Sequence, residues 1–126
     1  MAIVGVGIDS VEIDRFRDLL ARRETMRTRL FSPAELAAVA DRNDEAPSLA
    51  ARFAAKEATM KSLGLGLGAF GFHECEILRE ESGAPRLRAS GRLVELAHEH
   101  GVAAWHVSLT HTDSMASAVV IADSLT

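Results

Sequence analysis

The chain has 126 residues, enough for one domain with a hydrophobic core and too few for two, so we expect a single domain over residues 1–126. With 48% hydrophobic and 25% charged residues, the composition is that of a globular protein and excludes disordered and fibrous classes. A net charge of -4 argues against non-specific binding to nucleic acid, and no apolar run is long enough to span a membrane. The chain lacks a signal-peptide pattern and its single cysteine cannot form an internal disulfide, so we expect a cytoplasmic protein.

The N-terminal segment predicts a strand followed by a helix. Residues Ala2–Asp9 are apolar and contain two glycines, a pattern typical of a buried strand, and Asp9 comes where the strand is expected to end. Apolar residues at helical spacing then predict a helix from Val11 to about Arg23. The strand would present the Asp9 carboxylate at its exit, although the same residue could simply cap the helix.

Two further helices are predicted before residue 64. The sequence Ser32-Pro33-Ala34-Glu35 is a capping box with proline at the first helical position, which predicts a short helix to about Arg42. Residues 43–47 are polar and read as a loop. The next helix is expected over Leu49–Leu63, with Gly64 ending it.

The second half of the chain predicts two hairpins and a helix. The expected elements are strands at Phe72–Arg79 and Arg86–Ala89, a helix at Ser90–His100, and strands at Ala104–Thr110 and Met115–Ala122. Helices grouped early and strands grouped late favour the α+β class, with a small, mainly antiparallel sheet and helices packed on one face. The other face must then meet water or another subunit.

The helix predicted over Leu49–Leu63 carries two charged residues in an unexpected place. At 100° per residue, its apolar residues cover one half and Arg52, Thr59 and Ser62 lie opposite. Glu57 and Lys61, one turn apart, fall inside the apolar arc. They could form an exposed ion pair that contributes about 0.3 kcal/mol. Charges facing an apolar surface are costly without partners, however, and a metal ion or a bound phosphate would supply both partners.

Asp9 adds a second carboxylate to this group. Two carboxylates together with substrate phosphates are typical of a Mg²⁺ site, so Asp9 and Glu57 are candidate metal ligands. Mg²⁺ would neutralise a diphosphate, and Lys61 would stabilise the charge that develops on the transferred group. The sequence therefore indicates phosphoryl chemistry.

Two other segments carry weaker signals. His111 and Thr112 follow the strand predicted at Ala104–Thr110, where a histidine could contact phosphate or accept a proton, or have only a structural role. The first helix has a basic side that includes Arg15 and Arg22. This charge could be merely solubilising, or it could dock an acidic protein partner through electrostatic steering.

Three blocks of the sequence together closely resemble the holo-[acyl-carrier-protein] synthases, the short 4'-phosphopantetheinyl transferases. The blocks are Gly5-Val6-Gly7-Ile8-Asp9 with Arg15, the stretch Arg52-Phe53-Ala54-Ala55-Lys56-Glu57-Ala58-Thr59-Met60-Lys61-Ser62-Leu63-Gly64, and Ser108-Leu109-Thr110-His111-Thr112. The middle block, with its K-E-A-x-x-K core, is the specific one. The resemblance runs from the first strand to the final hairpin without a large insertion, and it implies the 4'-phosphopantetheinyl transferase fold.

The resemblance implies a reaction and a set of site residues. Asp9 and Glu57 would bind Mg²⁺ with the diphosphate of coenzyme A, and Lys61 would contact the phosphate that is transferred. A serine of an apo acyl carrier protein of fatty-acid or polyketide synthesis would attack the β-phosphate, releasing adenosine 3',5'-bisphosphate. The remaining implied contacts are Arg15 and Arg22 with the carrier, and Arg52, Gly64, His111 and Thr112 with the coenzyme and its nucleotide end.

Other features remain open at this point. A metal-bound water, Glu57 or His111 could each accept the serine proton. The resemblance also implies a homotrimer with active sites between subunits. His73-Glu74-Cys75-Glu76-Ile77 departs from the common family pattern, which affects carrier preference or local packing. The alternative functions are a non-catalytic module that binds coenzyme A or a nucleotide, and a Mg²⁺-dependent nucleotide hydrolase.

Overall fold

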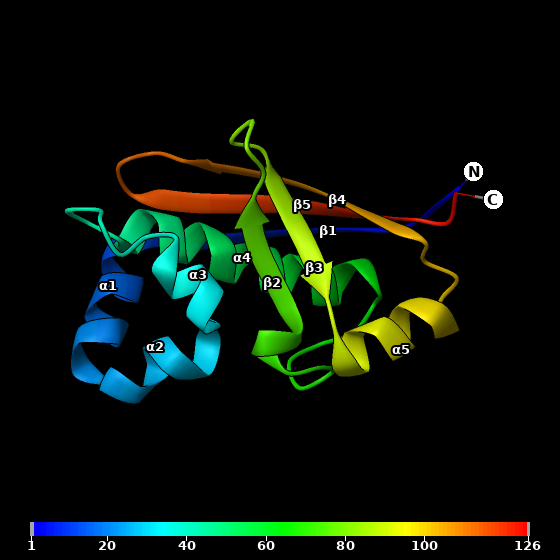
Figure 1. Cartoon of the computed structure of the whole chain (residues 1–126), viewed down its shortest axis with the longest axis horizontal. Helices are drawn as coiled ribbons and strands as arrows, with labels where there is room; N and C mark the ends of the chain where they lie inside the picture. The colour runs from blue at the N-terminus through cyan, green and yellow to red at the C-terminus, as the bar shows by residue number, and fades with distance from the viewer. Residues whose placement is uncertain (1, 126) are drawn as a thin grey trace.

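The computed structural model describes residues 2–125 and has the expected α+β class. Its elements in chain order are β1 (Ile3–Glu12), α1 (Ile13–Arg22), α2 (Glu24–Leu30), α3 (Pro33–Ala37), α4 (Ala46–Ser62), the 3-10 turn η1 (Phe72–Glu74), β2 (Cys75–Arg79), β3 (Pro85–Ala89), α5 (Gly91–Glu99), β4 (Ala104–His111) and β5 (Met115–Asp123) (Figure 1). No helix within residues 2–125 is long and apolar enough to cross a membrane.

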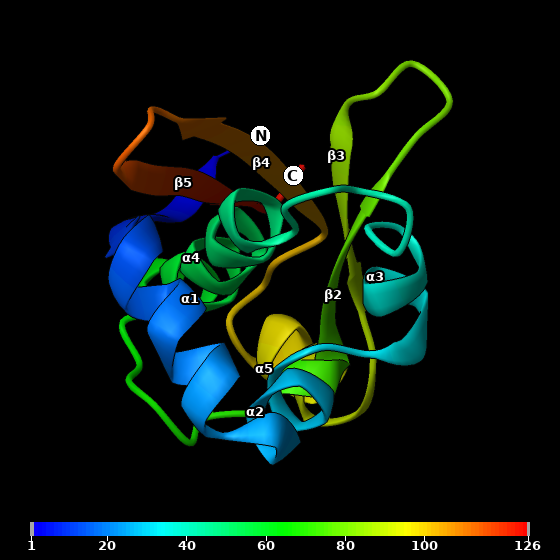
Figure 2. The same cartoon turned by 90° about the vertical axis from the view of Figure 1, so that its left-hand side faces the viewer.

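The strands form two antiparallel sheets instead of one. The larger sheet has the order β1-β5-β4, and the smaller one is the β2-β3 hairpin. Helix α4 lies along one face of the larger sheet, while α1, α2 and α3 gather at one end of the molecule and α5 at the other (Figures 1 and 2). As a result α4 is enclosed by elements from both halves of the chain.

Two glycines let β1 approach α4 closely. A Cβ atom on Gly5 would lie 1.8 Å from the Ser62 carbonyl oxygen, and one on Gly7 would lie 1.8 Å from the Ala58 carbonyl oxygen. Only glycine fits at such a contact. Because alternate residues of a strand share a face, Asp9 points toward α4 on the same side as these two glycines.

Several predicted boundaries were wrong. Strand β1 continues to Glu12, so Asp9 lies within the strand and is neither at its exit nor a helix cap. Helix α2 was not predicted, because Glu24–Leu30 has only two large apolar residues and two threonines. The capping box at Ser32 is confirmed, but α3 ends at Ala37, five residues early. Helix α4 begins at Ala46 with Pro47 in its first turn, so the polar loop is shorter than expected.

The polar half of α4 is not exposed to solvent, in contrast to that of an ordinary amphipathic helix. Arg52, Thr59 and Ser62 are buried, and Lys56 is 0% exposed. The large sheet covers one side of the helix, and β2, α3 and η1 lie against the other. Polar residues on that second side are buried because they find hydrogen-bond partners there, which amphipathic periodicity alone cannot reveal.

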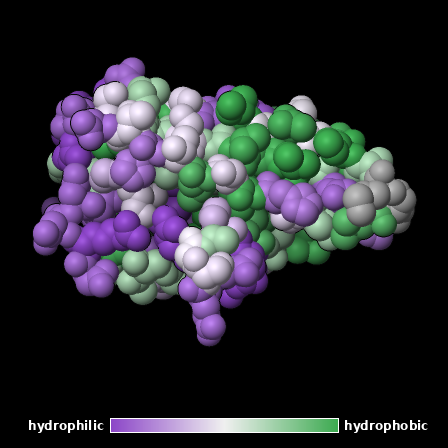
Figure 3. Space-filling model, turned by 90° about the horizontal axis from the view of Figure 1, so that it is seen from above, coloured by the Kyte–Doolittle hydropathy of each residue, from purple (hydrophilic) through white to green (hydrophobic). Residues whose placement is uncertain are grey.

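The outer face of the β1-β5-β4 sheet, away from α4, is partly apolar and uncovered in one chain. Val4, Val6 and Ile8 of β1 are 38%, 55% and 65% exposed. Figure 3 views the molecule from this side, and apolar side chains gather on it. An exposed contiguous apolar surface of this kind is typical of a protein interface.

Candidate active site

The two candidate metal ligands, Asp9 and Glu57, line one cleft. Asp9 comes from β1 and Glu57 from the middle of α4, and the cleft between them and α1 has a volume of about 480 Å³. The close contact that the β1 glycines permit between strand and helix brings these two side chains together. The two residues are almost 50 positions apart in the sequence, and the fold brings both side chains to this cleft.

Lys61 lies beside Asp9 and is not paired with Glu57. Its Nζ atom donates to Asp9 Oδ1 at 2.9 Å and to the Ile8 carbonyl oxygen at 3.0 Å. No hydrogen bond or ion pair joins the Lys61 and Glu57 side chains among the described residues, so the simple pair one turn apart is not formed. The lysine instead connects the end of α4 to β1.

The environment of Glu57 disfavours its charge. Partial burial raises the pKa of its carboxyl group, and the nearby charge of Asp9 raises it further, while Lys61 acts in the opposite direction. A cation that joins Glu57 to the second carboxylate of the cleft would offset this effect. Ionised Glu57 is therefore favoured by cation binding.

The donor set fits a hard divalent cation that is shared with a substrate. Within residues 2–125 there is no cluster of three or more histidine, cysteine, aspartate or glutamate side chains suited to hold a metal ion. A site with only Asp9 and Glu57 suits Mg²⁺, which typically takes one or two carboxylates and completes its shell with water and substrate phosphate. The same two ligands would not make a closed structural metal site.

Helix α1 forms the rim of this cleft. Arg15, Asp18, Leu19 and Arg22 project from the side of the helix that faces it. The Arg15 side chain is 82% exposed, with only a long contact of 3.8 Å to Glu12. Asp18 has no side-chain hydrogen bond or ion pair to any described residue. The rim therefore presents two guanidinium groups, one lone carboxylate and a leucine to a partner.

A second, smaller pocket of about 70 Å³ contains His111. It is lined by Arg42, Ser48, Ala51, Arg79, Leu109, Thr110 and His111. Arg52 lies buried next to it, where its Nε donates to the Ile77 carbonyl oxygen at 3.0 Å and its Nη1 donates to the Ser48 hydroxyl. Burial lowers the pKa of Arg52, as does the charge of Arg79. Three guanidinium groups so close together favour a bound anion.

Sequence reasoning missed Arg42 and Arg79 in this pocket. Arg42 follows α3 and Arg79 ends β2, and neither lies near His111 in the sequence. In the sequence, each is only an arginine at the end of a predicted helix or strand, which does not indicate a binding site. The tertiary fold brings them to His111.

The two remaining predicted coenzyme residues line neither pocket. Gly64 is exposed just after α4, with a φ of 70° that suits glycine, and its amide donates to the Lys61 carbonyl oxygen. Thr112 shapes the β4-β5 turn, where its hydroxyl accepts from the amides of Ser114 and Met115. Within one chain, neither residue joins His111 or Glu57 in a pocket.

The cleft and the second pocket lie toward opposite edges of one sheet. Asp9 pairs with Ala118 of β5, which in turn pairs with Leu109 of β4. Neighbouring strands lie about 4.8 Å apart, so the outer strands are roughly 10 Å apart. His111 lies two residues beyond Leu109 and shares no pocket with Asp9. One chain thus keeps Asp9 and Glu57 apart from His111.

Comparison with known proteins identifies the family. Residues 5–122 match the 4'-phosphopantetheinyl transferase superfamily. The holo-[acyl-carrier-protein] synthase of Streptomyces avermitilis is 49% identical over 123 residues, which cover 98% of this chain and 99% of that protein. The chain belongs to the 4'-phosphopantetheinyl transferase superfamily. The resemblance read from the three sequence blocks is confirmed.

Solved structures agree with this family. The holo-[acyl-carrier-protein] synthase of Neisseria meningitidis superimposes with a TM-score of 0.88 at 29% identity, covering 97% of this chain and 99% of that chain. The enzyme of Helicobacter pylori, determined in complex with coenzyme A, has a TM-score of 0.82 at 29% identity over 94% of this chain and 99% of that one. This chain is accordingly an enzyme of the phosphopantetheinyl transferase class, and its fold is that of the family.

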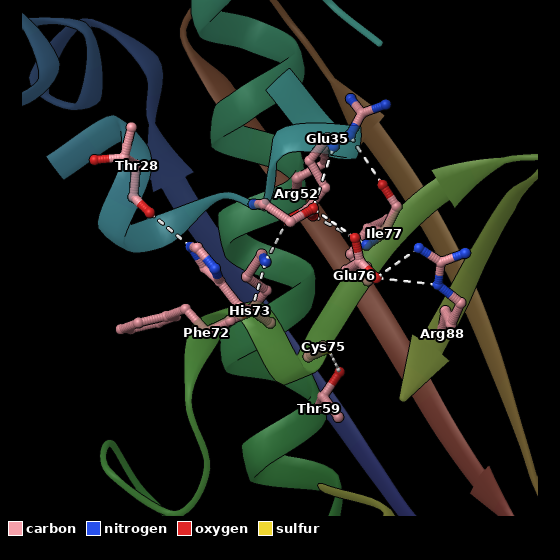
Figure 4. Close-up of polar contacts among 12 residues, drawn as sticks. Thr28, Glu35, Arg52, Thr59, Phe72, His73, Cys75, Glu76, Ile77 and Arg88 are labelled. Carbon is pink, nitrogen blue, oxygen red and sulfur yellow. Dashed lines mark hydrogen bonds and ion pairs between the residues drawn. The ribbon is translucent and has the colours of Figure 1, made fainter. Parts of the chain in front are cut away.

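The positions where this transferase departs from the family pattern have structural partners. The Glu74 carboxylate accepts the amides of Gly71 and Arg92, both at 2.7 Å, which ties η1 to the start of α5 and lowers the pKa of Glu74. Cys75 is 0% exposed beside Thr59, and burial raises its pKa to about 12 (Figure 4). Neither residue lines the cleft of Asp9 and Glu57.

Proposed function

We propose that this enzyme transfers the 4'-phosphopantetheine arm of coenzyme A to a serine of an apo acyl carrier protein in a Mg²⁺-dependent reaction. The observation that carries this proposal is that Asp9 and Glu57 line one cleft, with Lys61 in contact with Asp9 and two arginines of α1 on the cleft rim. The coenzyme A complex of the Helicobacter pylori relative supports coenzyme A as the donor.

Asp9 and Glu57 would hold the cation, which supplies positive charge to the coenzyme diphosphate and helps to position it. The serine hydroxyl attacks the β-phosphorus of that diphosphate and forms a new P–O bond. The bond from the β-phosphorus to the bridging oxygen breaks, and adenosine 3',5'-bisphosphate leaves with that oxygen. Lys61, with its flexible side chain, reaches the transferred phosphate and stabilises its charge.

The serine proton needs an acceptor near the cleft. Glu57 lines the cleft, and burial raises the pKa of its carboxyl group, which makes it a stronger proton acceptor than an ordinary glutamate. His111 lies in the other pocket of the same chain, so it would serve as the base only where a second chain brings its own His111 to this cleft. We therefore favour Glu57 within one chain.

The second pocket suits the nucleotide end of coenzyme A. Arg42, Arg79 and His111 offer cationic or hydrogen-bonding groups to a phosphate, with Arg52 holding Ser48 beneath them. Because this pocket and the cleft are separate in one chain, we propose that a complete site combines the cleft of one subunit with the pocket of another. This arrangement would require the chain to form an oligomer, and the family resemblance implies a homotrimer.

The outer face of the β1-β5-β4 sheet is the surface that would join the subunits. Val6→Lys, at a side chain 55% exposed in one chain, is expected to leave the fold intact but to convert trimers into inactive monomers. Light scattering should give three times 13.5 kDa for the unmodified protein and the monomer mass for the variant. Full activity from a protein of monomer mass would contradict the inter-subunit site.

The reaction itself is tested by intact mass spectrometry of an apo acyl carrier protein after incubation with the enzyme, coenzyme A and Mg²⁺. We expect the carrier to gain one phosphopantetheine, and EDTA to abolish the gain. Adenosine 3',5'-bisphosphate should appear in equal amount. Release of a nucleotide product without any modified carrier would favour a hydrolase instead, and absence of both products would favour a binding module.

The charges on α1 should tune the affinity for an acidic carrier in opposite directions. Arg22→Gln is expected to raise KM for the carrier about fivefold, because it removes a rim cation. Asp18→Asn is expected to lower that KM, because Asp18 is an unpaired carboxylate on the same rim. KM for coenzyme A should change in neither variant. The measurement is initial rate against carrier concentration at low salt, where such charges are least screened.

Arg17→Gln is the matched control. Arg17 lies on α1 but away from the cleft, where it pairs with Asp14 and Asp44. It has the same change of charge and should leave the carrier KM unchanged. Equal effects of Arg17→Gln and Arg22→Gln would mean that only net charge matters, and would contradict docking on this rim.

A further inference from the structure

We infer that Lys61 is the internal counter-ion of the proposed cation site: its ammonium occupies the place beside Asp9 in the resting enzyme and must leave before a divalent cation binds there. This inference rests on the proposed function, because it takes the cleft of Asp9 and Glu57 as the cation site. Lys61 would therefore have two positions, one in contact with Asp9 and one in contact with the transferred phosphate.

The contacts of Lys61 are those of a bound cation. Its Nζ atom is 2.9 Å from Asp9 Oδ1 and 3.0 Å from the Ile8 carbonyl oxygen, two oxygens from adjacent residues of β1. The Asp9 side chain is 15% exposed, so without the lysine its carboxylate would be largely desolvated and unpaired. Lys61 thus supplies the positive charge that balances the Asp9 carboxylate.

The same ammonium can leave Asp9 readily. The Lys61 side chain is 53% exposed and has a flexible four-carbon stem, so it can turn toward solvent or toward a ligand without disturbing α4. A divalent cation on Asp9 would lie next to this ammonium and repel it. A carboxylate oxygen in contact with the lysine is therefore not free for a metal ion.

Coenzyme A offers the displaced ammonium a new partner. Its diphosphate is anionic, and Lys61 can exchange Asp9 for phosphate while the cation takes Asp9. Cation and coenzyme should therefore bind cooperatively, each raising the affinity for the other by the same factor, as linkage requires. The resting enzyme would bind the cation weakly on its own, because the cation has to compete with Lys61.

The chain offers a direct spectroscopic test, because it contains only two lysines, Lys56 and Lys61. Lys56 is 0% exposed and its Nζ atom is held by Glu35 and the Phe72 carbonyl oxygen, so it is an internal reference. Protein labelled with ¹³C at the lysine ε carbons should show two sets of signals. Titration with MgCl₂ alone is expected to shift the Lys61 signals and leave those of Lys56 in place.

Titration calorimetry measures the competition between Lys61 and Mg²⁺ for Asp9. Lys61→Met is expected to bind Mg²⁺ alone at least about fivefold more tightly than the unmodified enzyme, and to show a smaller enhancement of Mg²⁺ binding by coenzyme A. Arg15→Gln is the matched control, since Arg15 has the same charge and lines the same cleft but does not touch Asp9. It should change Mg²⁺ affinity less than about twofold, the small effect of an exposed charge without direct contact.

The outcomes separate this inference from the proposed function. If Mg²⁺ binds the unmodified enzyme but the Lys61 signals do not move, or if both variants tighten Mg²⁺ binding equally, Lys61 does not compete for Asp9 and the inference is wrong. If Mg²⁺ does not bind even with coenzyme A present, the cation site itself is wrong and the proposed function fails with it. Should Lys61→Met not fold, the titration of the unmodified protein still decides.

Discussion

Glu57→Gln is expected to reduce phosphopantetheinyl transfer by about 10³-fold, the loss of several kcal/mol of charge stabilisation by the cation. The amide has the shape of the carboxylate but no charge, so one of the two proposed cation ligands is weakened. Glu57 is half-buried and has no side-chain hydrogen bond or ion pair to a described residue. The substitution should therefore leave no partner unsatisfied, and the melting temperature should be close to that of the unmodified enzyme.

The activity of this variant is measured as the rate of mass gain of the carrier over a range of Mg²⁺ concentrations. Glu12→Gln is the control, because Glu12 lines the same cleft from the α1 side and carries the same charge. It should retain activity within a few-fold of the unmodified enzyme. Unchanged turnover in Glu57→Gln would refute the metal role, and equal losses in the two variants would point to a general loss of negative charge.

The raised pKa of Glu57 also gives a pH dependence with a definite sign. Cation binding requires the ionised carboxylate, so apparent Mg²⁺ affinity should fall as the pH decreases through the Glu57 pKa. Because burial and Asp9 raise that pKa, the fall should begin at a higher pH than for an ordinary glutamate, whose value is 4.5. In Glu57→Gln this dependence should be lost.

Lys56→Met is expected to lower the free energy of unfolding by about 3–5 kcal/mol, the usual cost of breaking a buried ion pair. Lys56 Nζ lies 2.7 Å from Glu35 Oε1, and both side chains are 0% exposed. Glu35 also accepts the amides of Ser32 and Ile77, as the network in Figure 4 illustrates for Ile77. The pair links α3, α4 and β2. Removing the ammonium leaves the Glu35 carboxylate as an uncompensated buried charge.

Urea unfolding monitored by circular dichroism measures this cost. Glu35→Gln combined with Lys56→Met should recover part of the lost stability, because the neutral amide no longer needs a counter-charge. Arg88→Met is the surface control. It breaks the ion pair with Glu76, in which the Arg88 side chain is 51% exposed, and should cost no more than about 1 kcal/mol. Similar costs for Lys56→Met and Arg88→Met would contradict the buried-pair account.

Much of the fold could be predicted from local signals. The capping box at Ser32, the glycine-bearing first strand and the alternation in β4 each depend on short-range chemistry, and these elements begin at or next to the expected residue. The meeting of Asp9 with Glu57 and Lys61 was predicted because charges on an apolar face require partners. Such a requirement can be read from one segment even when the partner lies in another.

Features that depend on distant partners could not be predicted. Arg52 was expected on a polar face, but it is buried because the Ile77 carbonyl oxygen, 25 residues away, accepts its Nε–H. A Glu57–Lys61 ion pair was one alternative read from the sequence, but the Lys61 side chain instead contacts Asp9 and the Ile8 carbonyl oxygen of β1. The short helix α2 has a weak periodic pattern, and its last residue, Leu30, packs into the core.

The two lysines also determine how this protein can be handled in the laboratory. Among lysine side chains, only Lys61 is accessible to amine-reactive dyes or coupling resins, because Lys56 is enclosed. Labelling there would attach the reagent next to Asp9, which lines the candidate cleft. Thiol reagents have no better target, since the single cysteine, Cys75, is buried. Biosensor or fluorescence work therefore needs a tag or an introduced cysteine on a surface away from α1 and the outer sheet face.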